Sequence, residues 1–183
     1  RQRAEFTWPD VGASFNWAHD VFDVIAAGND AVALHISETD ASGNTTDVKR
    51  TFEQLRVRSD QVAQWMLAQG ARKGDVAMLM LGNRLELWEI MLAALKIGVV
   101  MLPTSVVLGA NELIDRVDRG TVKWVFAAPD DAMKFTEVPG NYSGVVVGFD
   151  DATNDQRAAL YEWLPFEESS AASLAKVAKT TKS

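Results

Sequence analysis

The stretch "VAMLMLGNRLELWEIMLAALKIGVVML", Val76 to Leu102, decides the fold because it holds a strand, a helix and a second strand in direct succession. Its opening residues are all apolar, which is typical of a parallel-sheet strand covered on both faces. A helical period then runs from Leu85 to Ile97, and Gly98 separates it from "VVML". Three charged residues, Glu86, Glu89 and Lys96, argue against a membrane span. The stretch predicts a β-α-β unit with a deeply packed helix that is capped by Asn83 and ended by Gly98. Gly98 is expected to have a positive φ or to allow close packing of the helix on the next strand.

The segment just upstream has the clearest helical pattern of the chain. Its apolar and small residues recur with the helical period: Phe52, Leu55, Ser59, Val62, Ala63, Met66 and Leu67. Thr51 and Gln54 have the spacing of a capping box, in which each side chain satisfies the other residue's backbone N–H. Gly70 is placed to stop the helix.

The segments before and after these elements also predict helices and strands. "FNWAHDVFDVIAAG" predicts a short helix that ends at Gly28, with Val21, Val24 and Ile25 on one side. "AVALHIS" and "TTDVKRT" predict two antiparallel strands. A helix over 110–119, ended by Gly120, leads to the strand "KWVFAA", and "GVVVGF" predicts a further strand.

Together these elements predict an α/β fold, a mostly parallel layered sheet with helices on both faces, plus an N-terminal antiparallel strand pair. We assign residues 1–166 to one α/β subdomain. The small, polar and lysine-dotted residues 167–183 are expected to be a linker or a weak helix.

The composition limits the class of function. The 183 residues hold 18 Lys and Arg against 25 Asp and Glu, a net charge of −7, which disfavours nucleic acid as a partner. The absence of cysteine removes thiol nucleophiles and Cys-ligated zinc and is compatible with a cytoplasmic location. The start without Met or a signal-peptide pattern suggests a chain cut at its beginning.

The motifs that cradle phosphate or hold metal are missing. Neither the Rossmann nor the P-loop glycine spacing occurs, and the helix start near Asn83 is more readily a cap than an anion site. His19 and His35 lie on different predicted elements, so we expect structural or surface roles for both.

The other chemistry-bearing residues also have simpler interpretations. The acidic pairs that begin at Asp130, Asp150 and Glu167 suit turns and caps better than a paired acid and base. Thr104 and Ser105 follow a strand end where ligands bind in such sheets, but no base is identifiable beside them. We expect the tryptophans to be core residues (Trp65, Trp88 and Trp124) and the arginines Arg116 and Arg119 to form a solvated face with Asp115 and Asp118. We therefore assign no catalytic, cofactor or metal residue.

Laid end to end, the elements resemble the N-terminal part of the adenylate-forming acyl-CoA synthetases. The resemblance lies in "FNWAHDVFD" and in the run from "TFEQLRVRSDQVAQWMLAQGARKGD" through "LMLGNRLELWEIMLAALKIGVVMLPT" to "NELIDRVDRGTVKWVFA". It is strong from Phe15 to Ala127 and weak on to Phe166, and "FNWA" and "RVDRG.VKWV" favour the medium-chain branch. Gly109 departs from the Thr or Ser that usually caps the "NEL" helix, so a weaker cap is expected.

The resemblance implies a two-step ligase that uses ATP, Mg²⁺ and coenzyme A on a small carboxylic acid. A carboxylate would attack the α-phosphate of ATP to give an acyl-adenylate and pyrophosphate, and coenzyme A would then displace AMP. The phosphate loop, the adenine and ribose contacts, the hinge and the C-terminal lysine of that family have no counterpart in the 183 residues. We therefore expect an inactive fragment whose partner is the remainder of the synthetase. The alternative is a complete small α/β binding or interaction domain without catalysis.

Overall fold

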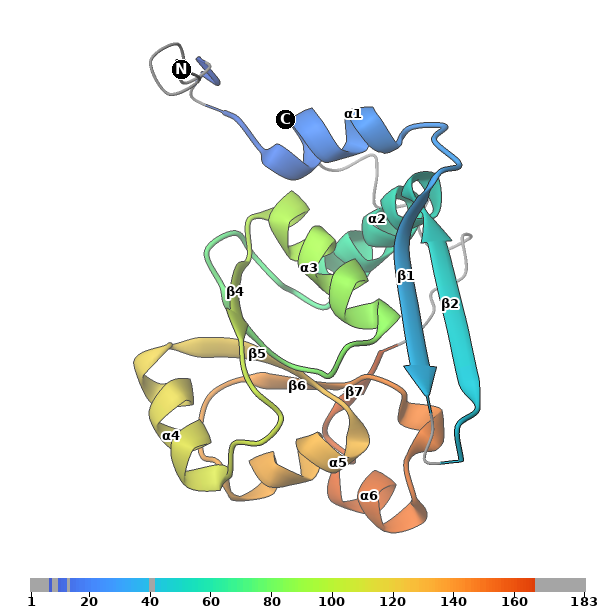
Figure 1. Cartoon of the computed structure of the whole chain (residues 1–183). Coiled ribbons are helices and arrows are strands. Elements are labelled where there is room, and N and C mark those ends of the chain that lie inside the picture. Colours follow the sequence, from blue (N-terminus) through green and yellow to red (C-terminus); the bar gives the residue numbers. More distant parts are fainter. Residues whose placement is uncertain (1–6, 8–9, 13, 40–41, 167–183) are drawn as a thin grey trace.

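The parallel sheet predicted from the sequence forms the centre of the molecule. The computed structural model describes residues 7, 10–12, 14–39 and 42–166. Five parallel strands lie in the order β4-β3-β5-β6-β7 (Figure 1). They are β3 (Val76–Met80), β4 (Val100–Pro103), β5 (Val122–Ala127), β6 (Ser143–Val146) and β7 (Leu164–Pro165). The first strand of the β-α-β unit therefore lies inside the sheet, and its second strand lies at the edge.

Helices cover both faces of this sheet, as expected. One face carries α2 (Phe52–Ala68) and α3 (Leu85–Ile97). The other carries α4 (Ala110–Arg119), α5 (Pro129–Ala132), η3 (Met133–Glu137) and α6 (Asn154–Ala159), below the sheet in Figure 1. Alternate residues of β3 point to the two cores: Ala77 and Leu79 pack under α2 and α3, and Met78 and Met80 pack on the α4 side. Both faces are thus buried, which explains the continuous apolar run.

The antiparallel pair lies outside the main sheet. Strands β1 (Val32–Thr39) and β2 (Thr45–Thr51) pair with each other and stand beside α2 and α3 (Figure 1). Strand β2 runs directly into α2, and the helix begins with the predicted capping box. The Thr51 hydroxyl accepts from the Gln54 N–H at 3.2 Å, and the Gln54 side chain accepts from the Thr51 N–H at 2.9 Å.

Gly98 has the role predicted for it. It ends α3 with φ +73°, a conformation that side chains other than glycine rarely adopt. A Cβ at this position would also lie 2.9 Å from Cγ of Lys73, so the turn between α3 and β4 is both left-handed and tightly packed. Gly70 likewise follows α2 with φ +100°.

The N-terminal helix differs from the prediction. It consists of a π-helical turn, η2 (Ala18–Phe22), followed by α1 (Asp23–Ala26). The buried side chains are Ala18, Phe22 and Ala26, whereas Val24 is 71% exposed and Ile25 is 56% exposed. The predicted side of Val21, Val24 and Ile25 is not the packed one. Ala18, Phe22 and Ala26 recur every four residues, and their face is buried toward Leu55 and the β1-β2 pair.

Side chains hold this N-terminal segment on the body of the molecule. The amide of Asn16 donates to the carbonyl oxygens of Leu95 and Lys96 at 2.9 and 3.1 Å, so it caps the carboxyl end of α3. An apolar hollow of about 550 Å³ lies between the segment, α3 and the β1-β2 pair, with Trp17, Ile25 and Trp88 on its wall.

No helix within the described part of the chain is long and apolar enough to cross a membrane.

Candidate functional site

The carboxyl ends of the parallel strands form the candidate site. The chain leaves β3 toward β4 on one side and later crosses to β5 on the other, so the sheet has a switch point between β3 and β5. Open α/β sheets bind ligands beside such a point, where the loops that follow the strands diverge. The loops concerned are 81–84, 104–109, 128 and 147–153.

The loop after β3 is organised by Arg84. Its guanidinium makes two hydrogen bonds to the Glu86 carboxylate, at 2.9 and 3.0 Å. Arg84, not Asn83, is the N-cap residue of α3, and it makes no side-chain cap hydrogen bond. Asn83 was predicted to be the cap, but its Oδ1 instead accepts from the indole N–H of Trp88 at 3.4 Å.

Glu86 occupies the helix start that an external anion would need. Burial alone would raise the pKa of this carboxyl, but hydrogen bonds from Arg84 and from the backbone N–H of Glu86 itself outweigh burial, and the pKa is lowered. The first turn of α3 therefore already holds a negative charge of its own, which complements the helix dipole. An additional phosphate there would meet electrostatic repulsion.

Arg84 also joins this loop to the end of β6. Its Nη1 donates to the Val147 carbonyl oxygen at 3.5 Å. Gly148 has φ +81°, and a Cβ on it would lie 3.1 Å from Nη2 of Arg84 and 3.2 Å from Oδ2 of Asp151. Glycine is needed here because the backbone turns left-handed directly beneath the two charged groups.

A buried ion pair between α2 and α3 lies close to the same edge of the sheet. Arg58 of α2 donates to Glu89 of α3 at 3.0 Å, with side chains only 16% and 5% exposed. Burial raises the pKa of Glu89, and the Arg58 charge and hydrogen bond oppose that shift without cancelling it. Arg58 also lies 5.8 Å from the ring centre of Phe166, which packs edge-on against Trp65. These contacts fix the point at which the chain leaves β7.

Together these groups enclose a charged cavity of about 600 Å³ at the ends of β3, β6 and β7. Its wall is formed by two arginines, three carboxylates and two aromatic rings: Arg58, Arg84, Glu86, Asp150, Asp151, Phe149 and Phe166. The cavity wall carries both positive and negative side chains. Arg84 forms an ion pair with Glu86, and Arg58 forms one with Glu89. The cavity is therefore not a simple phosphate cradle.

The predicted nucleophiles do not form a catalytic group. Thr104 is buried, and its hydroxyl donates to the Leu102 carbonyl oxygen at 3.1 Å. The Ser105 hydroxyl accepts from the Val107 N–H at 3.4 Å. Within residues 42–166 neither hydroxyl has a hydrogen bond to a side chain that can act as a base, so both serve the turn after β4.

Two of the three acidic pairs, those at Asp130 and Asp150, lie in short helical turns that follow strands, as predicted. Asp130 accepts from the Gln156 amide at 2.6 Å, and Asp131 pairs with Lys134 at 2.8 Å. The backbone carbonyl oxygen of Asp150 accepts from Arg157 at 2.9 Å within a short 3₁₀ turn. Glu167 lies outside the described residues.

Each histidine pairs with a neighbouring carboxylate. His19 lies 3.1 Å from Asp23, and His35 lies 2.8 Å from Asp47 across the hairpin, with both imidazoles about half exposed. Where the structure describes the chain, no three His, Asp or Glu side chains gather to hold a metal ion.

The tryptophan and arginine predictions hold in part. Trp65 and Trp124 are buried, but Trp88 is 41% exposed, so assigning it to the core was wrong: it lies on the side of α3 that faces the apolar hollow instead of the sheet. Arg119 pairs with Asp115 at 3.4 Å on an exposed face, as expected.

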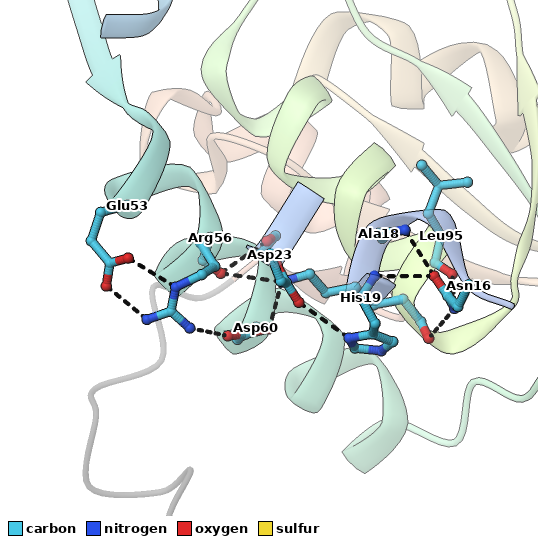
Figure 2. Close-up of polar contacts among 10 residues, drawn as sticks. Asn16, Ala18, His19, Asp23, Glu53, Arg56, Asp60 and Leu95 are labelled. Atoms are coloured by element: carbon cyan, nitrogen blue, oxygen red, sulfur yellow. Dashed lines mark hydrogen bonds and ion pairs between the residues drawn. The ribbon is translucent and has the colours of Figure 1, made fainter. Parts of the chain in front are cut away.

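A second charged cluster was not found from the sequence. The side chain of Lys96, only 1% exposed, has its Nζ 2.7 Å from Asp23 Oδ1 and 2.6 Å from Asp60 Oδ1. Figure 2 shows how Arg56 extends the cluster by bridging Asp60 and Glu53, while His19 approaches Asp23 from the other side. The only sequence signal was a lysine in an otherwise apolar helix.

Comparison with known proteins shows which proteins this chain resembles in sequence and fold. The profile of the family described as "AMP-binding enzyme" matches residues 23–180. Acetoacetyl-CoA synthetase from Mus musculus is 36% identical over 99 residues, which are 54% of this chain and 14% of that protein. Acyl-coenzyme A synthetase ACSM5, mitochondrial, from Rattus norvegicus is 34% identical over 119 residues, 62% of this chain and 20% of that protein.

Solved structures share the fold. The acyl-CoA synthetase of Brucella canis superposes with a TM-score of 0.67 at 22% identity, over 86% of this chain and 31% of that one. The N-terminal subdomain of Klebsiella oxytoca NpsA superposes with a TM-score of 0.57 at 22% identity, over 78% of this chain and 32% of that one. The chain spans about a fifth or less of the length of the two curated relatives, the Mus musculus and Rattus norvegicus synthetases.

Proposed function

Because the chain belongs to the AMP-binding enzyme family, we propose that it forms the N-terminal α/β subdomain of an acyl-CoA synthetase. The whole enzyme would join a carboxylic acid to coenzyme A at the expense of ATP, through an acyl-adenylate. Residues 1–166 would be the subdomain, and residues 167–183 would lead toward the phosphate loop. The observation that carries the proposal is the family match over residues 23–180, a range that contains every strand of the described sheet.

The part that these residues play in the reaction is structural. The start of α3 is occupied by Glu86, and the arginines of the edge cavity are engaged in ion pairs, so the described residues do not fit a nucleotide phosphate. Nucleotidyl transfer needs prearranged donors and a metal around the phosphates. We therefore expect ATP, Mg²⁺ and coenzyme A to be held mainly by other residues of the whole enzyme.

The carboxyl edge would then serve as the wall against which those residues pack. The Arg58–Glu89 pair joins α2 to α3, and Arg84, held by Glu86, joins the start of α3 to Val147 at the end of β6. Catalytic geometry depends on support of this kind, since a displacement of about 1 Å can cost about 100-fold in rate.

The test is exchange of labelled pyrophosphate into ATP with short, medium-chain and aromatic carboxylic acids. The 183-residue chain is compared with a polypeptide extended along the same reading frame. We expect exchange only in the extended polypeptide. Exchange by the 183 residues alone would refute the scaffold role, and inactivity of both would favour a binding domain without catalysis.

A further inference from the structure

A cavity of about 530 Å³ lies on the α6 side of the sheet, where β6 and β7 begin. Its wall combines residues 135–136 of η3, residues 140–144 before and within β6, and residues 159–164 between α6 and β7. It lies at the opposite end of β6 from the charged cavity of the carboxyl edge. We call it the aromatic cavity and define it by the four aromatic residues and the one charged residue that line it among those described: Phe135, Tyr142, Tyr161, Trp163 and Glu162.

Three of the aromatic rings hold one another in place. The buried ring of Phe135 lies 6.1 Å from that of Tyr142 and 5.8 Å from that of Trp163, centre to centre. Two glycines let the outer rings lie directly on backbone. A Cβ on Gly140 would lie 2.7 Å from the Tyr142 ring, and a Cβ on Gly144 would overlap the indole of Trp163. The wall is therefore formed by the fold itself, which lowers the entropy cost of binding a ligand.

Glu162 gives the aromatic cavity a negative charge. Its carboxylate accepts a hydrogen bond from the Tyr161 hydroxyl at 2.9 Å, and this bond raises the pKa of the phenol. Both side chains are exposed. Glu162 makes no ion pair with any residue that the structure describes, and no basic residue of the described chain lines the cavity. The carboxylate is therefore available to a cation from solution.

The part of the chain that surrounds the aromatic cavity is acidic. Residues 104–166 contain ten Asp and Glu against five Lys and Arg. A surface potential of this sign raises the local concentration of cations and lowers that of anions. The surroundings therefore favour a cationic ligand and disfavour a carboxylate.

Aromatic rings beside one carboxylate suit a quaternary ammonium group. A cation is attracted to a ring face within about 6 Å of the ring centre. A primary ammonium has three N–H donors that need acceptors when it leaves water, whereas a quaternary ammonium has none. We propose that the aromatic cavity binds a small organic cation with a quaternary ammonium head, which lies against Tyr161 and Trp163 and beside Glu162. The site does not depend on the function proposed above.

The test is isothermal titration calorimetry of the 183-residue chain, without ATP, with three probes. They are choline, its uncharged carbon isostere 3,3-dimethyl-1-butanol, and the primary amine ethanolamine. We expect saturable binding of choline with a Kd at or below about 1 mM, and at least about tenfold weaker binding of the other two. An equal affinity for the isostere would overturn the role of charge, and an equal affinity for ethanolamine would overturn the quaternary head. Choline that does not saturate the chain by about 10 mM would refute the site.

Variants at exposed positions then locate the site. Glu162→Gln removes the charge and should weaken choline binding about fivefold or more, and Tyr161→Leu removes the most exposed ring and should weaken it about threefold or more. Glu38→Gln removes an exposed carboxylate of β1 and should leave binding unchanged. Circular dichroism checks the folding of each variant. A folded Glu162→Gln variant that binds choline normally, or an equal loss in Glu38→Gln, would refute the assignment.

Discussion

Replacement of Lys96 by methionine tests the charged cluster between the N-terminal segment, α2 and α3. Lys96→Met keeps an unbranched apolar stem of similar size but removes the ammonium that lies 2.7 Å from Asp23 and 2.6 Å from Asp60. Breaking a buried ion pair by removing one partner costs about 3–5 kcal/mol, because the other charge is left uncompensated. That range must be discounted here, since the Asp60 side chain is 36% exposed and keeps Arg56, and Asp23 keeps His19.

We therefore expect Lys96→Met to lower the free energy of unfolding by about 2–3 kcal/mol. The assay is urea unfolding followed by tryptophan fluorescence, in which a loss of this size shifts the midpoint by about 1–1.5 M if the slope is about 2 kcal/mol/M. The control is the triple variant Lys96→Met, Asp23→Asn, Asp60→Asn, which leaves no unpaired charge and should recover most of the loss. A single variant within about 0.5 kcal/mol of the wild type, or a triple variant less stable than the single one, would refute the argument.

Three further predictions concern local structure. Gly98→Val should cost more than about 1 kcal/mol because of the left-handed turn, and an unchanged urea midpoint would contradict this. Thr51→Ala should cost about 1 kcal/mol, and its effect should couple to that of Gln54→Ala in a double-mutant cycle; strict additivity would argue against the capping box. The hydrogen bond from Arg56 lowers the pKa of Glu53 from 4.5 to about 2, so its stabilisation is complete above pH 4.5 and is lost as the pH falls toward 2. Glu53→Gln should reduce the change in the free energy of unfolding between pH 4.5 and about pH 2. If this pH dependence is unaltered in the variant, another group is responsible for it.

The sequence was most informative where local pattern and global fold agree. The apolar run of β3, the helical period of α3 and the glycine between α3 and β4 are all local signals, and all three are found in the structure. The start of α3 could not be predicted in the same way. Asn83 is a good capping residue on its own, but the adjacent Arg84 and Glu86 bind each other and take over the first turn.

The buried charged groups of the candidate site and of the Lys96 cluster depend on contacts that no local pattern reveals. Glu89 meets Arg58 from a different helix, and Lys96 meets Asp23 and Asp60 from two different elements. In the sequence these residues look like interruptions of an apolar helix. Their burial becomes understandable only when the partners are brought together, because a charge is rarely buried without one.

The attachment of the N-terminal segment has a consequence for how the molecule opens. Residues 16–26 contribute no strand to the main sheet, and they are held mainly by Asn16 on the end of α3, by Asp23 on Lys96 and by the packing of Phe22. Segments with few buried contacts open below the free energy of global unfolding. Amide hydrogens in 18–27 should therefore exchange with deuterium well before those of β3 and β5, and each such opening would bring Lys96 and the apolar hollow into contact with water while the sheet stays intact.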